Sequence, residues 1–172
     1  AVLSGDLRVV SDRMDSVESV SIGIWVNAGA RNEDASNNGV SHLLEHMAFK
    51  GTDRRSSLDI ATEIENVGGH LNAYTSRETT VYYATVLKEN INLALDIISD
   101  IVLHSIFDND ELDRERGVVL QEISQANDTP DDIVFDLFQE TAYPDQPLGR
   151  PILGTEESVG SMSRRTLVDY IN

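Results

Sequence analysis

The stretch Gly39-Val40-Ser41-His42-Leu43-Leu44-Glu45-His46-Met47-Ala48-Phe49-Lys50-Gly51-Thr52 holds, within five residues, three side chains that can bind a metal ion or transfer a proton. If the segment is helical, His42 and His46 lie one turn apart on one face, and Glu45 lies on the same side. Two imidazoles in this arrangement can share one zinc ion, which leaves the carboxylate free to act on a metal-bound water. The stretch therefore predicts a helix with His42 and His46 as Zn2+ ligands and Glu45 as a proton acceptor. The alternative is a pair of ordinary histidines on a helix.

The length and composition are those of a globular domain. The 172 residues are enough for one domain with a buried core, and 40% of them are hydrophobic and 25% charged. No apolar run is as long as a membrane-spanning helix, so we expect no membrane insertion. Because the chain has no cysteine, any metal would be held by histidines and carboxylates.

The chain is strongly acidic, with a formal net charge of -17 from 30 acidic and 13 basic side chains. Such a surface repels the phosphates of nucleic acids and of anionic membranes, and it attracts basic molecules. The charge therefore predicts no nucleic-acid partner and favours a basic one. The alternative is that the charge serves solubility alone.

Strand-like and helical patterns alternate along the chain. The predicted strands are residues 7–11, 18–27, 70–75 and 79–87. In the strand predicted at residues 18–27, every second residue is apolar and lies on one face: Val20, Ile22, Ile24 and Val26. Trp25 lies on the opposite face. The predicted helices are residues 39–50, 56–67, 90–104, 109–126, 130–141 and 163–170.

These elements predict an α+β fold, with an antiparallel-rich mixed sheet and helices packed on one face. We expect residues 1–172 to form a single lobe. Four strands beside this much apolar helix would normally be joined by further strands. We therefore expect the lobe to be truncated, as a fragment of a longer polypeptide.

The third metal ligand is best sought on the helix predicted at residues 109–126. Glu115 and Glu122 are seven residues apart, two helical turns, and so share a face. The segment between them is apolar, and a carboxylate beside a buried stripe is costly without a partner such as a metal. We expect Glu122 to be the ligand and Glu115 to support it, although spacing alone does not choose between them. The alternative is that both are solvated.

Several motifs now form a recognisable set. Beside the histidine stretch they are residues 29–33 (Gly-Ala-Arg-Asn-Glu), 68–75 (Gly-Gly-His-Leu-Asn-Ala-Tyr-Thr), 115–122 and 147–154 (Pro-Leu-Gly-Arg-Pro-Ile-Leu-Gly). Along essentially its whole length, the chain resembles the inverted-zinc (HxxEH) peptidase family of pitrilysin, insulin-degrading enzyme and the processing peptidases. Residues 49–52 and 147–150 look most like the branch of the processing-peptidase β subunit and the bacterial processing peptidases.

The resemblance implies roles for named residues. His42, His46 and Glu122 would hold Zn2+, and Glu45 would be the general base that activates a zinc-bound water. Glu115 would orient the ligands from behind. The segment around Asn72, Ala73 and Tyr74 resembles the family's edge strand, whose backbone binds the substrate in extended form.

The resemblance also implies a preference for arginine near the cleaved bond. The matching positions here are Asp132 and Asp136, which are four residues apart on one face of the helix predicted at 130–141 and could present paired carboxylates to a guanidinium. The alternative is a solvated first turn, in which aspartates are favoured by the helix dipole.

Family members are longer, with two similar lobes, and many act with a second subunit. The resemblance thus implies an N-terminal catalytic lobe of a zinc endopeptidase for extended, basic, presequence-like peptides, completed by a C-terminal lobe or a second subunit. The alternatives are a non-catalytic partner or scaffold subunit, or an inactive fragment that binds zinc. Non-catalytic members typically lose the H-x-x-E-H residues, which this chain keeps. The expected compartment is the bacterial cytoplasm, with the mitochondrial matrix as the alternative.

Overall fold

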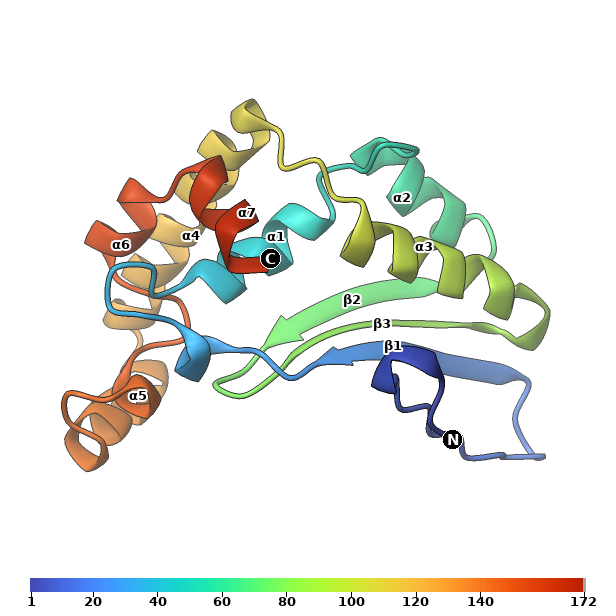
Figure 1. The fold of residues 1–172 in the computed structure, drawn as a ribbon, viewed down its shortest axis with the longest axis horizontal. Coiled ribbons are helices and arrows are strands. Elements are labelled where there is room, and N and C mark those ends of the chain that lie inside the picture. Colours follow the sequence, from blue (N-terminus) through green and yellow to red (C-terminus); the bar gives the residue numbers. More distant parts are fainter. Residues whose placement is uncertain (172) are drawn as a thin grey trace.

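The sheet of this protein has three antiparallel strands in the order β1-β3-β2, formed by β1 (Ser19–Val26), β2 (His70–Thr75) and β3 (Thr80–Leu87). The structure is a computed structural model that describes residues 1–171. A tight turn joins β2 to β3, and the register places Tyr82 of β3 between Ile24 and Ala73. Within the described residues, β1 and β2 are therefore the two edges of the sheet (Figure 1).

Two helices cover one face of this sheet, α2 (Ser57–Glu65) and α3 (Ile91–Leu103) (Figure 1). The alternation predicted for β1 brings Ile22 and Ile24 against the helices, and the same face of β3 contributes Tyr82 and Ala84. The helices contribute the apolar side chains Ile60, Ile64, Ala94, Ile97, Ile98 and Ile101 to this sheet-side core. The predicted α+β class, with helices packed on one face of an antiparallel sheet, is confirmed.

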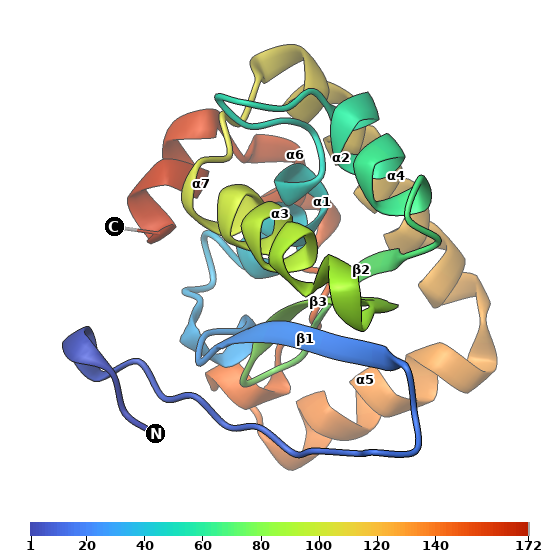
Figure 2. The same cartoon turned by 90° about the vertical axis from the view of Figure 1, so that its right-hand side faces the viewer.

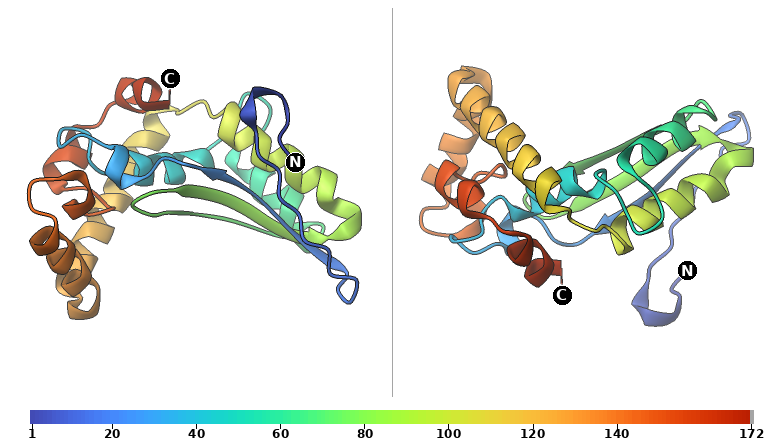
Figure 3. Two further views of the ribbon diagram at one scale, coloured as in Figure 1. Left: turned by 60° about the horizontal axis from the view of Figure 1, so that its bottom comes forward. Right: turned by 90° about the horizontal axis from the view of Figure 1, so that it is seen from above.

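Helix α1 (Val40–Ala48) lies between the sheet layer and a second group of helices at the other end of the molecule (Figure 3). That group contains α4 (Asn109–Asp128), α6 (Glu156–Ser161) and α7 (Arg164–Ile171). It shares with α1 a separate helix-side core of Val40, Leu43, Leu44, Met47, Phe107, Leu112, Val119, Ile123, Val159, Met162 and Leu167. Helix α1 is thus packed on both sides, and its position is fixed by both halves of the protein.

Helix α5 (Pro130–Ala142) follows α4 and packs against it (Figure 1). It has no buried residue, and Phe135 and Phe138 are exposed on it. Short 3-10 helices occur at Ser4–Asp6, Ala30–Asn32, Lys88–Asn90 and Pro147–Gly149.

The prediction of a strand at residues 7–11 is wrong. Its only pairing is an isolated bridge between Arg8 and Val2, and the side chains of this segment are exposed. Figure 2 shows the N-terminal segment outside the packed body of sheet and helices. An alternating pattern makes a strand only where a neighbouring strand takes up its backbone hydrogen bonds, and no such strand lies beside it within residues 1–171.

Two further features complete the fold. Helix α6 is absent from the sequence prediction, although Thr155 begins it with a capping box in which its hydroxyl accepts the N–H of Ser158 at 3.1 Å. Trp25 lies on the outer face of the sheet as predicted, 62% exposed and close over Gly23.

Across residues 1–171, no helix combines the length and the apolar character needed to span a membrane.

Candidate metal centre

The N-terminus of α1 is held by a buried carboxylate. Glu33 is 2% exposed, and its oxygens accept the backbone N–H of Gly39 at 2.7 Å and of Ser41 at 2.8 Å. Gly39 has a φ of +95°, and a Cβ there would lie 2.6 Å from the carbonyl oxygen of Leu153, so glycine is required. A negative charge at a helix N-terminus satisfies free N–H groups and complements the helix dipole. These contacts set the start of the helix that carries both histidines.

His42 and His46 lie one turn apart on α1, with ring centroids 4.7 Å apart and planes at 72°. Glu122 approaches them from α4, and its Oε2 is 3.7 Å from Nε2 of His42 and 3.5 Å from Nε2 of His46. One ligand atom from each of the three residues lies within 4.8 Å of the others. The structure thus brings together the three residues proposed as ligands from the sequence, from two helices far apart in the chain.

The chemistry of these donors fits a zinc ion. Burial, together with the nearby His46, lowers the pKa of His42 to about 4. The imidazole is therefore neutral at pH 7, which is the form that binds metals. Two imidazole nitrogens and one carboxylate are a common donor set for catalytic zinc, and three protein ligands leave a fourth position open.

Glu45 lies on α1 directly before His46, and Thr75 of β2 is close to its carboxylate. Burial raises its pKa above the ordinary value, while hydrogen bonds from the side chain and backbone of Thr75 act in the opposite direction. Its Oε2 is buried and has no hydrogen-bond partner among the described residues. Glu45 therefore has one carboxylate oxygen without a partner, and Thr75 at the end of β2 is the neighbour that lowers its pKa most.

Glu115 lies on α4 behind His46. It is 7% exposed, and its Oε2 is 3.0 Å from Nδ1 of His46. Its Oε1 is 2.7 Å from Nζ of Lys50. Burial alone would raise the pKa of Glu115, but the hydrogen bonds and charges of Lys50 and His46 outweigh burial and hold the pKa below its ordinary value. The carboxylate is therefore ionised and both of its oxygens are used.

Sequence reasoning gave Glu33, Lys50 and Thr75 no role at this site, although all three lie in the motifs that carry the family resemblance. The signals for Lys50 were its place in the motif at residues 49–52 and its spacing, four residues after His46 and just past the end of α1. Glu33 and Thr75 lie in a loop and at the end of a strand, and their contacts with α1 form only through tertiary packing.

The segment proposed to bind substrate is an edge of the described sheet. Asn72, Ala73 and Tyr74 lie on β2, which pairs on one side with β3, and α1 packs against β2. Asn72 and Tyr74 are exposed, whereas Ala73 points into the sheet-side core. The edge strand and the histidines are therefore neighbours.

The two aspartates proposed to read arginine differ in their surroundings. Asp136 Oδ1 is 2.9 Å from Nη2 of Arg77, whose Nε also donates to the carbonyl of Leu148 at 3.2 Å. Asp132 is exposed and has no ion pair among residues 1–171. Neither aspartate belongs to the histidine cluster. Asp136 thus already binds a guanidinium of its own chain.

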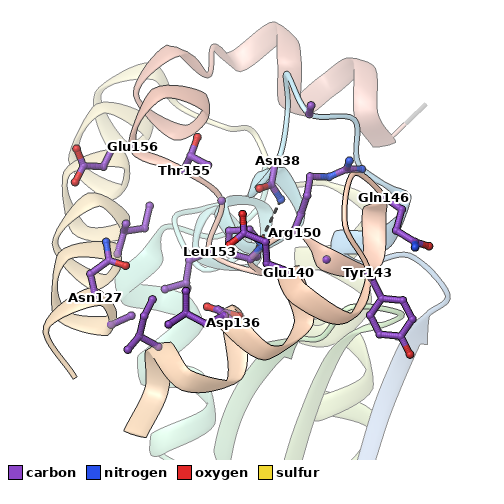
Figure 4. A pocket seen from close by; sticks show the side chains of 18 of the residues that line it. Asn38, Asn127, Asp136, Glu140, Tyr143, Gln146, Arg150, Leu153, Thr155 and Glu156 are labelled. Atoms are coloured by element: carbon purple, nitrogen blue, oxygen red, sulfur yellow. Dashed lines mark hydrogen bonds between the residues drawn. The ribbon is translucent and has the colours of Figure 1, made fainter. Parts of the chain in front are cut away.

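A cavity of about 710 Å³ lies beside the helix-side core, between the end of α4, one face of α5 and residues 145–156 (Figure 4). Its wall carries the carboxylates of Asp136, Glu140, Asp145 and Glu156. Asn38, which is 1% exposed, donates from Nδ2 to the carbonyl of Pro151 at 3.0 Å at its rim (Figure 4). None of the three proposed metal ligands lines this cavity.

The chain is similar to known proteins over most of its length. Residues 8–156 match the model of the family described as insulinase (peptidase family M16). The chain is 48% identical to the mitochondrial-processing peptidase subunit beta of Rattus norvegicus over 98% of its own length and 34% of that protein. It is 46% identical to the uncharacterized zinc protease YmxG of Bacillus subtilis over 96% of its own length and 41% of that protein.

Among solved structures, the crystal structure of a protease from Helicobacter pylori matches with a TM-score of 0.86 and 23% identity, over 90% of this chain and 38% of that one. At this identity the match shows a common fold. The chain spans about a third to two fifths of the length of the curated relatives compared here.

Proposed function

The chain belongs to the insulinase family (peptidase family M16), and from this premise we propose that residues 1–172 are the zinc-binding lobe of a metalloendopeptidase that cleaves extended, basic peptides. The observation that carries the proposal is the convergence of His42, His46 and Glu122 from α1 and α4, with Glu45 beside them. The names of two relatives, a processing peptidase subunit and a zinc protease, agree with this reading.

His42, His46 and Glu122 would hold the zinc ion. When bound, zinc polarises a carbonyl and makes a water more acidic. The neutral state of His42 and the open fourth position support this assignment. Glu115 keeps the ring of His46 in place through Nδ1, so that Nε2 faces Glu122.

Glu45 would be the general base. In this role its free Oε2 accepts a proton from the attacking water and then delivers that proton to the leaving amine. The raised pKa supports the role, since it makes the carboxylate a stronger proton acceptor for the attacking water.

The substrate would add a strand to the free edge of β2. An extended peptide can pair with the backbone groups of Asn72 to Tyr74 that β3 does not pair, which sets its carbonyls in register with the adjacent α1. The exposed side chains of Asn72 and Tyr74 would then contact substrate side chains. This arrangement selects extended peptides over folded proteins.

Charge supports a basic substrate. The formal net charge of -17 attracts cationic peptides over distances of about one Debye length. We propose that an arginine of the substrate binds at Asp132, with Asp136 nearby on the same face of α5. Because Asp136 is paired with Arg77, Asp132 is the freer of the two carboxylates.

The rest of the enzyme would come from a C-terminal lobe of a longer chain or from a second subunit. One relative is named as a subunit, which supports the second source. We propose the bacterial cytoplasm as the compartment, with the mitochondrial matrix as the alternative, because the relatives include bacterial and mitochondrial proteins. The alternative function is a non-catalytic partner or scaffold subunit, or a fragment that only binds zinc.

The proposal is tested by metal analysis of the native gene product, purified together with any subunit that copurifies with it. We expect one zinc per chain, abolished by His46→Ala. Glu45→Gln should keep the zinc but lose hydrolysis of a fluorogenic arginine-containing peptide by about 10²- to 10⁴-fold. A folded, zinc-supplemented sample without bound zinc would overturn the metal site. Full turnover by Glu45→Gln would overturn the role of Glu45, and zinc binding without any turnover by the wild type would favour the non-catalytic alternative.

A further inference from the structure

We propose that Lys50 is a positioning residue of the metal centre: its ammonium group holds Glu115, and Glu115 thereby fixes the ring of His46. The inference rests on the proposed zinc-binding function and concerns a residue that does not itself contact the metal. It predicts that a lysine outside the ligand set controls metal affinity.

The three side chains form a chain of two contacts. Nζ of Lys50 lies 2.7 Å from Oε1 of Glu115, and Oε2 of Glu115 lies 3.0 Å from Nδ1 of His46. The side chains are 29%, 9% and 17% exposed, in the order Lys50, Glu115 and His46. The contact between Lys50 and Glu115 is therefore largely shielded from water. A charged hydrogen bond in such a shielded position is stronger than one at the surface.

A carboxylate held at one oxygen can still rotate about its last carbon–carbon bond. Because Lys50 holds Oε1, the plane of the Glu115 carboxylate is fixed and Oε2 stays directed at the ring of His46. Lys50 is also the only basic residue with a salt bridge to Glu115 among residues 1–171, apart from His46 itself. Without Lys50, a nearly buried carboxylate would lose the cation that compensates its charge.

The two histidines depend on this contact unequally. Nδ1 of His42 is buried and has no hydrogen-bond partner among the described residues, whereas Nδ1 of His46 faces Glu115. The ring of His42 packs edge-on against the ring of His46. The orientation of the pair is therefore set by hydrogen bonding at His46, and a disturbance at Lys50 reaches both rings.

The competing interpretation is an ordinary ion pair that only closes the end of α1, since the N–H of Lys50 also donates to the carbonyl of Met47 at 3.1 Å. Exposed ion pairs contribute little to stability, and one that is only structural would leave metal affinity unchanged. The chain offers a matched control. Its only other lysine, Lys88, pairs with Glu18 at the surface, with side chains 62% and 74% exposed.

The experiment measures the zinc Kd of the native gene product by competition with a chromophoric chelator. The variants are Lys50→Met, Lys50→Arg, Lys88→Met, Glu115→Gln and the double variant Lys50→Met, Glu115→Gln. We expect Lys50→Met to raise the zinc Kd about tenfold and Lys88→Met to leave it unchanged, because partners behind a ligand typically change affinity 10- to 100-fold. Lys50→Arg should recover most of the loss. Denaturant unfolding of each metal-free variant checks that it is folded.

The double variant separates a positioning role from a structural one. If Lys50 acts through Glu115, Lys50→Met should cause no further loss in the Glu115→Gln background. A Kd of Lys50→Met within twofold of wild type, or an equal loss in both backgrounds, would overturn the proposal while leaving the zinc site intact. Absence of zinc binding in the wild type would overturn the proposed function as well. The two failures are therefore distinguishable.

Discussion

The carboxylate of Glu33 accepts the backbone N–H of Gly39 at 2.7 Å, and so a residue of the preceding loop holds the first turn of the helix that carries the histidines. The second oxygen accepts from Ser41, one residue before His42. The start of α1 and the position of the first proposed ligand are thus set together.

Replacing Glu33 should therefore affect stability and metal binding together. Glu33→Ala removes two caps and leaves buried N–H groups without partners, so we expect a loss of about 3 kcal/mol in the free energy of unfolding. The zinc Kd should rise because the first turn of α1 is released. Urea unfolding and zinc competition measure the two effects. Glu78→Ala, which removes an exposed partner of Arg31, is the control. A stability loss below about 0.5 kcal/mol would contradict the capping role.

Thr75 should affect catalysis more than metal binding. Thr75→Val keeps the shape of the side chain but removes the hydroxyl that lowers the pKa of Glu45 and that donates to the carbonyl of Ser41 at 3.4 Å. We expect kcat to fall about tenfold, because a base that is less well oriented transfers protons less efficiently. The zinc Kd should stay within twofold of wild type, since Thr75 is not one of the three proposed ligands. An unchanged kcat would show that Thr75 does not orient Glu45.

The pH dependence of stability should depend on Asp100. This residue is fully buried and binds Thr52, Arg54 and Arg55. Burial raises its pKa, but hydrogen bonds from these partners outweigh burial and lower the pKa to about 2. A carboxylate with a lowered pKa stabilises the fold above its unfolded-state pKa near 3.8, and this contribution is lost as the pH falls toward 2.

We therefore expect Asp100→Asn to lower stability at pH 7 and to flatten the acid side of the stability curve between about pH 4 and 2. Urea unfolding at a series of pH values provides the measurement. Asp169→Asn, at an exposed ion pair on α7, is the control. If the free energy of unfolding of Asp100→Asn falls between pH 4 and 2 as steeply as that of the wild type, Asp100 is not the source of the pH dependence.

Asp132 and Asp136 should differ in their effect on specificity. Asp132→Asn should raise KM for arginine-containing peptides about tenfold relative to the matched alanine peptides, because an exposed carboxylate is removed without disturbing the fold. Asp136→Asn should instead lower stability, because it leaves the half-buried Arg77 without its anionic partner. Kinetics with arginine and alanine versions of the same peptide measure the effect of Asp132→Asn, and thermal unfolding measures the effect of Asp136→Asn. Equal losses for both peptides would contradict the reading of arginine by Asp132.

Much of the site could be predicted because it depends on local periodicity. His42, Glu45 and His46 share a face through helix geometry alone, and Glu115 and Glu122 share one for the same reason. What the pattern could not supply was the contact between the two helices in atomic detail. Lys50 became part of the site only when the end of α1 met α4, and Thr75 only when β2 packed on α1.

The fold was predictable in class but not in every pairing. The strands β1, β2 and β3 follow their alternation, whereas residues 7–11 have a similar pattern and remain exposed, since pairing depends on a neighbouring strand. The pairing of Asp136 with Arg77 could not be predicted from the sequence either, because it joins α5 to the turn between β2 and β3. Long-range contacts of this kind have no signature in the spacing of residues.

Helix α1 contributes Val40, Leu43 and Met47 to the helix-side core and Ala48 to the sheet-side core. The two proposed histidine ligands are therefore mounted on the one element that both cores share. A substitution in either core that shifts α1 by a fraction of an ångström would change the distances to Glu122 without touching any ligand. The affinity for the proposed zinc ion is therefore expected to change with the packing of either core, so that damage far from the ligands would lower it before the protein unfolds.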